Sequence, residues 1–176
     1  MKRTLSVVVG LVLCVQLASA QVGNSGTRPQ TNARTADPRV KAALDRLGIQ
    51  YEVDRDGDYK LTRNVPDSNG RTQLVFIDSK TYPVEGIGEI REIWAPAIRS
   101  TTPLSSSVAN RLLRNSFQMK LGAWEIYGGS RAQAYMAVFS AKVGAELDSD
   151  TLRTTIDLVM QNADQMEKEL TGKDDF

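Results

Sequence analysis

Short turns join segments in which apolar and polar residues alternate, and this feature restricts the fold more than any other. Apolar residues recur at every second position from Ile49 to Val53, and the same period continues from Tyr59 to Val65. A period of two is that of a half-buried strand, and Asp56-Gly57 between two such segments is typical of a β-hairpin whose two central residues take positive φ. A second turn is predicted at residues 66–70, which read PDSNG. The sequence therefore predicts antiparallel strands joined by hairpins.

Three more stretches favour strands. Residues 74–77 are apolar on both faces, which indicates a central strand, and residues 87–98 indicate another strand that ends near Pro96, with a short helix as the alternative. Residues 121–127 and 132–143 predict a second hairpin around Gly128-Gly129-Ser130.

Three helices are predicted around these strands. The first follows Asp37-Pro38, a capping residue before a proline that suits the first helical position, and ends at Gly48. Thr102-Pro103 repeats that pattern and predicts a helix to about residue 119, and a third helix is predicted from about 148 to 170. In the second helix we expect four apolar side chains to face the core: Leu104, Val108, Leu112 and Leu113. The order α-β-β-β-β-α-β-β-α predicts an α+β domain with an antiparallel sheet and about three packed helices.

The first twenty residues have the layout of a secretory signal peptide. Lys2 and Arg3 precede an apolar run that is too short to span a membrane, and Ala18-Ser19-Ala20 supplies small residues before a cleavage point. Lipid attachment at Cys14 is the alternative. We therefore expect a signal peptide at 1–20, a flexible linker at 21–36, one domain at 37–172 and a tail at 173–176. The expected location is periplasmic or secreted, without stable membrane insertion after cleavage.

Composition excludes several kinds of chemistry in the processed chain. Loss of Lys2 and Arg3 leaves 20 of the 22 basic residues against 21 acidic ones, a net charge of −1, which gives no broad attraction for nucleic acid. The chain has no histidine, and cleavage removes Cys14, its one cysteine. Ser-His-Asp and Cys-His catalysis and the usual zinc sites are thereby excluded. We expect no catalytic residue, no metal and no cofactor, and hence a chain that is not an enzyme.

Three alternating aspartates, Asp54, Asp56 and Asp58, raise the question of a calcium loop or a catalytic acid cluster. An EF-hand loop that starts at Asp54 needs glycine at its sixth position and a bidentate glutamate at its twelfth, where this chain has Tyr59 and Val65. The hairpin turn is the interpretation we favour.

Apolar residues point to both faces of the predicted sheet, and this pattern suggests a binding surface. If helices cover one face only, the second face meets a third helix, a second subunit or a partner. We take Tyr135, Phe139 and Trp94 as candidates for a partner-binding surface. The expected function is an exported protein-binding, chaperone-like or regulatory module, with a second copy of the chain as one candidate partner. The alternatives are a carboxylate-dependent hydrolase of a cell-envelope polymer and a carrier of a small lipophilic ligand.

Two stretches, VKAALDRLGIQYEVDRDGDYKL and VANRLLRNSFQMKLGAWEIYGG, resemble the YbjN-like family, whose fold is similar to that of type III secretion chaperones. Asn110 matches the family's helix pattern, whereas the second asparagine falls late, at Asn115. In element order the resemblance runs from about Pro38 to Leu170. It implies a non-enzymatic domain of regulatory or sensory type, with chaperone-like relatives that dimerise and hold extended segments of partners. It supplies no catalytic residue.

Overall fold

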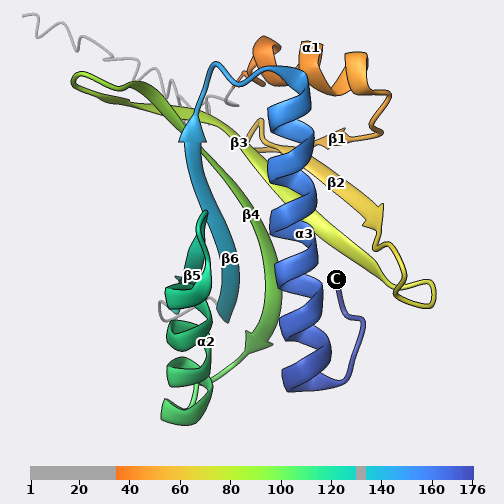
Figure 1. Ribbon diagram of the computed structural model, residues 1–176, viewed down its shortest axis with the longest axis vertical. Helices are drawn as coiled ribbons and strands as arrows, with labels where there is room; N and C mark the ends of the chain where they lie inside the picture. The colour runs from red at the N-terminus through yellow and green to blue at the C-terminus, as the bar shows by residue number, and fades with distance from the viewer. Residues whose placement is uncertain (1–34, 130–133) are drawn as a thin grey trace, which may run out of the picture. The chain divides into compact units, whose positions relative to one another are not determined.

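The computed structural model describes residues 35–129 and 134–176, so the predicted signal peptide, Cys14 and nearly all of the predicted linker lie outside the described residues. The described part is an α+β fold whose three helices and six strands follow the predicted order (Figure 1). The elements are α1 (Pro38–Leu47), β1 (Glu52–Val53), β2 (Tyr59–Asn64), β3 (Thr72–Val84), β4 (Gly88–Ser100), α2 (Ser106–Gln118), β5 (Ala123–Gly128), β6 (Tyr135–Gly144) and α3 (Ser149–Thr171). The predicted fold class is confirmed.

The strands form one sheet in the order β1-β2-β3-β4-β6-β5, and every neighbouring pair is antiparallel. The segment predicted as a strand or a short helix is β4, which continues through Pro96 to Ser100. The β4–β6 register shifts between Pro96 and Ile98. Such an irregularity accommodates a proline, which has no N–H to donate, inside a sheet.

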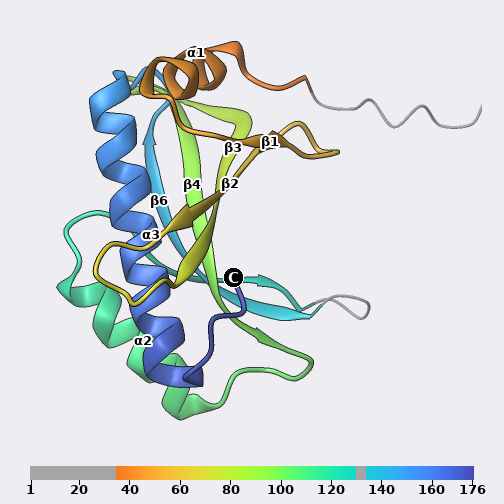
Figure 2. The ribbon, with the colours of Figure 1, turned by 90° about the vertical axis from the view of Figure 1, so that its right-hand side faces the viewer.

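The helices leave one face of the sheet without a helical layer. Figure 2 shows α3 and α2 on the same side of the sheet and α1 across its upper end. The core lies between α3 and the sheet, where apolar residues at helical spacing on α3 meet alternate residues of the strands. Its fully buried members include Ile77, Ile93, Phe139 and Ile156. No helix in the described residues is both long and apolar enough to cross a membrane.

Capping residues determine where the helices begin. Asp37 caps α1, as predicted, and Asp148 caps α3, which begins near its predicted start. Their side chains accept hydrogen bonds from the backbone N–H groups of Arg39 and Thr151. The predicted start of α2 at Thr102-Pro103 was wrong. Ser105 is the cap, since its hydroxyl accepts from Val108 N at 3.3 Å.

The aspartate-rich hairpin has a different turn from the one predicted. Among the described non-glycine residues only Asp67 and Asn69 have positive φ. The predicted two-residue turn needs positive φ at both Asp56 and Gly57, so that prediction was wrong. Gly57 alone takes φ 85°, and its N–H donates to Asp54 O at 3.0 Å. This matches a three-residue loop that ends on a left-handed glycine. The Asp54 carboxylate accepts from the N–H groups of Asp56 and Asp58, at 2.9 and 3.0 Å, and so serves the turn itself.

Candidate functional site

The outer side of α2 carries large apolar side chains in water. Leu112 points inward and is 4% exposed, whereas its neighbour Leu113 is 63% exposed and Phe117 is 90% exposed. Adjacent helical residues point about 100° apart, and residues four apart share a face, so Leu113 and Phe117 form one outward stripe. The expectation that Leu113 faces the core was therefore wrong, because 63% of its surface is exposed.

Strand β5 continues this apolar surface at the edge of the sheet. It pairs with β6 alone within the described residues. Trp124 fastens it to α2, since its indole N–H donates to Asn115 Oδ1 at 2.7 Å and its backbone N–H donates to Ser116 Oγ at 2.9 Å. Beyond this anchor, Ile126 and Tyr127 are each 56% exposed.

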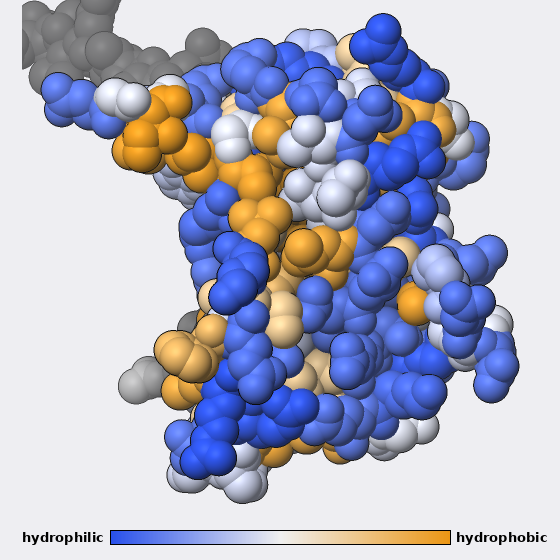
Figure 3. Space-filling view, viewed as in Figure 1, coloured by the Kyte–Doolittle hydropathy of each residue, from blue (hydrophilic) through white to orange (hydrophobic). Residues whose placement is uncertain are grey.

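An open hollow of about 120 Å³ lies between α2 and β5. It is lined by Leu104, Ala109, Leu112, Leu113, Trp124, Glu125 and Ile126. Glu125 is the one charged group of this lining, and it forms an ion pair with Lys142. We call the hollow together with Phe117 the α2–β5 surface. Figure 3 shows apolar surface in orange along the left edge, both beside the projecting β3–β4 hairpin and lower down where β5 meets α2.

The helix-free face of the sheet holds a second cluster, built on an aromatic stack. Trp94 stacks on Phe76 with ring centroids 4.2 Å apart and on Tyr127 at 5.5 Å. Both faces of the indole are therefore occupied. Its N–H donates to Asp78 Oδ1 at 3.0 Å.

The surroundings of Asp78 favour the protonated form of its carboxyl group. Burial raises the pKa of Asp78 to about 6, the charges of Asp58 and Glu92 act in the same direction, and the hydrogen bond from Trp94 offsets only part of the rise. Glu92 accepts a hydrogen bond from Ser140 Oγ at 2.6 Å, and Lys142 Nζ lies 4.0 Å from it. A carboxyl with this pKa can exchange a proton near neutral pH. The sequence analysis did not single out Asp78.

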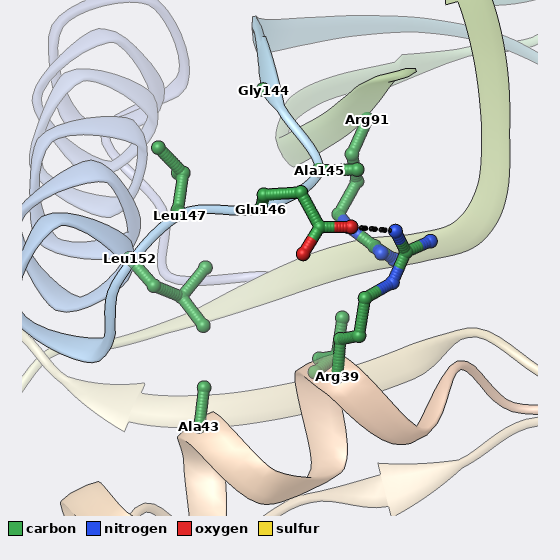
Figure 4. Close-up of a pocket in the computed structure, with 9 residues that line it drawn as sticks. Arg39, Ala43, Arg91, Gly144, Ala145, Glu146, Leu147 and Leu152 are labelled. Carbon is green, nitrogen blue, oxygen red and sulfur yellow. Dashed lines mark hydrogen bonds and ion pairs between the residues drawn. The ribbon is translucent and has the colours of Figure 1, made fainter. Parts of the chain in front are cut away.

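A network of ion pairs around Asp37 holds α1 against the strands, and Figure 4 shows one of these pairs, between Arg39 and Glu146. The Asp37 carboxylate accepts from Arg39 Nη2 at 2.7 Å and from Arg91 Nη2 at 2.6 Å. Arg39 also pairs with Glu89 and Glu146. Burial by itself would raise the pKa of Asp37, but the hydrogen bonds from both arginines hold it well below its usual range. Both guanidinium groups already have acidic partners. We therefore assign this network a structural role, which is to hold α1 against the strands.

A third cluster, near the C-terminus, brings together Asp164, Glu167 and Asp174, whose carboxylates could hold a cation. The Arg71 guanidinium lies among them, 2.5 Å from Asp164 Oδ1 and 3.2 Å from Glu167 Oε2. It also donates to Lys173 O at 2.6 Å, so residues of the predicted tail are hydrogen-bonded to the domain. The cation position is thus taken by an arginine.

The three residues that the sequence suggested for partner binding are not brought together. Phe139 is fully buried and packs edge-on against Trp124 at 5.3 Å, so it presents no surface to a partner. Trp94 lies on the helix-free face, and Tyr135 begins β6, half-buried opposite Gly128. Sequence reasoning did not single out Phe117 and placed Leu113 in the core, although the spacing of four residues between them in a helix was visible.

Comparison of the chain with protein-family models, with curated proteins and with solved structures gives no match.

Proposed function

We propose that the chain is an exported, non-enzymatic module that binds a protein through the α2–β5 surface. One observation carries the proposal: Phe117 and Leu113 project into water directly beside an apolar hollow. Single exposed apolar residues are ordinary, but a contiguous group of them with a hollow is typical of interaction sites. Burying one such side chain contributes about 1.5–3 kcal/mol.

The shape of the surface favours a protein over a small molecule. Its hollow is open on one side and flanked by a side chain that stands out from the helix, whereas small-molecule sites enclose most of the ligand. Edge strand β5 adds a row of backbone groups with which a partner strand could pair. The lack of histidine and the predicted loss of Cys14 agree with a binding role.

A comparative capture experiment tests the proposal. The immobilised chain, its Phe117→Ser variant and its Ile87→Ser variant are incubated with the exported fraction of the source cells. Ile87, at 71% exposure on the β3–β4 hairpin, provides a matched loss of apolar surface elsewhere. We expect one protein species to be retained by the unmodified chain and by Ile87→Ser, and its amount to fall at least tenfold with Phe117→Ser. Equal retention by all three, or none by any, would contradict the proposal.

A carboxylate-dependent hydrolase is the second candidate, and Asp78 favours it. Its pKa of about 6 would let it donate a proton while Glu92, on the neighbouring strand, acts as the other carboxylate. The test is hydrolysis of cell-envelope polysaccharide by the purified chain. Clearing that disappears in Asp78→Asn would establish this function in place of the binding module.

A further inference from the structure

We propose that the tip of the β3–β4 hairpin, residues 80–88, docks reversibly on the surface of an anionic phospholipid bilayer and inserts Ile87 among the lipids. This goes beyond the binding of a protein by the α2–β5 surface, because it involves other residues and a different partner. The hairpin projects past the end of β6 (Figure 1), and apolar surface lies beside it (Figure 3).

The hairpin tip stands clear of the rest of the sheet. Strand β2 pairs with β3 only as far as Ile77, and β6 pairs with β4 only from Ile90. Beyond these points, β3 and β4 pair only with each other among the described strands, up to the pair Val84 and Gly88. A projection of this kind can enter the polar layer of a membrane while the domain stays in water.

Along the tip, the side chains change in the same order as the layers of a membrane. Ile87, in the loop at the end, is 71% exposed, and its N–H donates to Val84 O at 3.0 Å. Val84 and Tyr82 are also exposed, and Tyr82 lies about 7 Å further along the strand. Tyrosine is enriched at the membrane–water interface, and apolar groups of peripheral proteins enter it by about 5–10 Å. Ile87 and Val84 therefore match the acyl boundary, and Tyr82 matches the headgroups.

Basic groups lie where the lipid phosphates would be. Lys80 Nζ is 4.4 Å from the centre of the Tyr82 ring, and Lys80 forms no ion pair among the described residues. At the base of the hairpin, the backbone N–H of Asp37 donates to Ser79 Oγ at 3.0 Å, so the predicted linker joins the domain at this place. Residues 21–36 of that linker contain two arginines and no acidic residue. This charge complements an anionic lipid surface, which attracts basic residues close to it.

The small size of the tip favours a membrane over a protein. A specific protein interface takes about 20–30 residues from each side. The tip has nine residues, and its apolar part consists of three side chains at the end of a narrow projection. A fluid lipid layer closes around such a projection, so it covers these side chains without needing a complementary shape.

Glu85 is the one acidic residue of the tip, and it opposes docking on anionic lipid. It is exposed and lies two residues before Ile87. The next carboxylate along the hairpin, that of Glu89, is paired with the Arg39 guanidinium and is thereby partly neutralised. Removal of the Glu85 charge should therefore strengthen the binding, which is the opposite of what a damaged hairpin would do.

Sedimentation with phospholipid vesicles tests the proposal. The full chain and its variants are mixed with vesicles of phosphatidylcholine alone or with phosphatidylglycerol added. We expect stronger binding when phosphatidylglycerol is present. Ile87→Ser should lower the partition coefficient at least about fivefold on both vesicles, and Lys80→Gln should lower it about fivefold only on the anionic ones. Phe117→Ser, a matched loss of exposed apolar surface elsewhere, should change nothing. All variants share the residues before Thr35, so differences between them report the hairpin.

Two further variants distinguish insertion from a change in folding. Glu85→Gln should bind anionic vesicles severalfold more strongly than the unmodified chain. Ile87→Trp keeps an apolar side chain at the tip, and its fluorescence should shift to shorter wavelength when vesicles are added. The spectrum of the unmodified chain is subtracted to remove the signal of the two native tryptophans. Circular dichroism checks that each variant folds.

The proposal is overturned by a chain that binds neither vesicle, by equal binding of Ile87→Ser, or by Glu85→Gln that binds no better. It is also overturned if Phe117→Ser loses vesicle binding, which would assign the lipid contact to the α2–β5 surface, or if Ile87→Ser loses the captured protein, which would make the tip a protein contact. Absent vesicle binding together with Phe117-dependent capture would remove this proposal alone and leave the proposed function in place.

Discussion

Removing the negative charge of Asp37 should destabilise the fold more than any other single change in the α1 network. Its carboxylate caps α1 and lies 2.6 Å from the guanidinium of Arg91, which is 2% exposed. Replacing Asp37 by alanine removes a cap, which costs about 1 kcal/mol. It also leaves a buried cation without its partner, which costs about 3–5 kcal/mol. Arg91 keeps its bond to Asp78 O, so we expect a total loss of about 4 kcal/mol.

The variant Asp37→Asn separates the two contributions. Asparagine is as good a cap as aspartate but carries no charge. We expect it to lose about 3 kcal/mol, nearly all from the unpaired Arg91. Adding Arg91→Met should then restore part of the stability, because the cation is no longer there. Urea unfolding followed by circular dichroism measures each free energy.

The pH dependence gives an additional check. The pKa of Asp37 is lower in the folded protein than in the unfolded chain, so its contribution is complete above the unfolded value of about 4. The contribution is lost as the pH falls through the folded pKa. The stability difference between the unmodified chain and Asp37→Asn should therefore be constant from pH 5 to 7 and shrink below pH 4. A loss under 1 kcal/mol for Asp37→Asn at pH 7, or a further loss on adding Arg91→Met, would refute the reasoning.

Three other predictions follow from the geometry. Gly122→Ala should lower the free energy of unfolding by about 3 kcal/mol, because the new Cβ would lie 2.7 Å from the Phe139 ring at a residue whose φ is 83°. Gly86→Ala, where φ is also positive but no atom lies near the new Cβ, should lower it by about 1 kcal/mol. Urea unfolding measures both values. Asp78→Asn should stabilise the protein by about 1 kcal/mol at pH 8 and have little effect at pH 3.5, because folding raises the pKa of this partly solvent-screened carboxyl to about 6, so its destabilising effect grows from the unfolded pKa near 4 up to pH 6. Added calcium should leave the melting temperature unchanged, since Asp54 is engaged by backbone N–H groups and Asp58 accepts from Ser79 N at 2.7 Å.

Each of these has an outcome that would contradict it. Equal costs for the two glycine variants would show that the contact with Phe139 relaxes freely. A stabilisation by Asp78→Asn that is the same at both pH values would mean that the charge of Asp78 is not the cause. A calcium-dependent rise of several degrees would restore the calcium-loop interpretation of the aspartates.

Local signals in the sequence were enough for most of the fold. Asp37, Gly48, Asp148 and Gly172 mark helix ends through contacts within a few residues of each cap, so the sequence shows them directly. The hairpins are visible for the same reason. The start of α2 was missed because two capping patterns stand three residues apart, and the local sequence does not decide between Thr102 and Ser105.

The site depended on long-range information that periodicity lacks. Alternation along β6 shows that Phe139 and Met136 face opposite sides, but not which side α3 covers. The stack of Phe76, Trp94 and Tyr127 joins three strands, and its existence depends on the register between them. The choice between Leu112 and Leu113 likewise depends on how α2 is rotated against β5.

Site-specific photo-cross-linking tests the central claim most directly. A photoreactive phenylalanine analogue is placed at position 117, at position 87 on the projecting hairpin, or at position 62 on the helix-free face, and the source cells are irradiated. If the α2–β5 surface is the binding surface, position 117 gives a discrete protein adduct and positions 87 and 62 give none. Adducts from position 62 or 87 with none from 117 would contradict it.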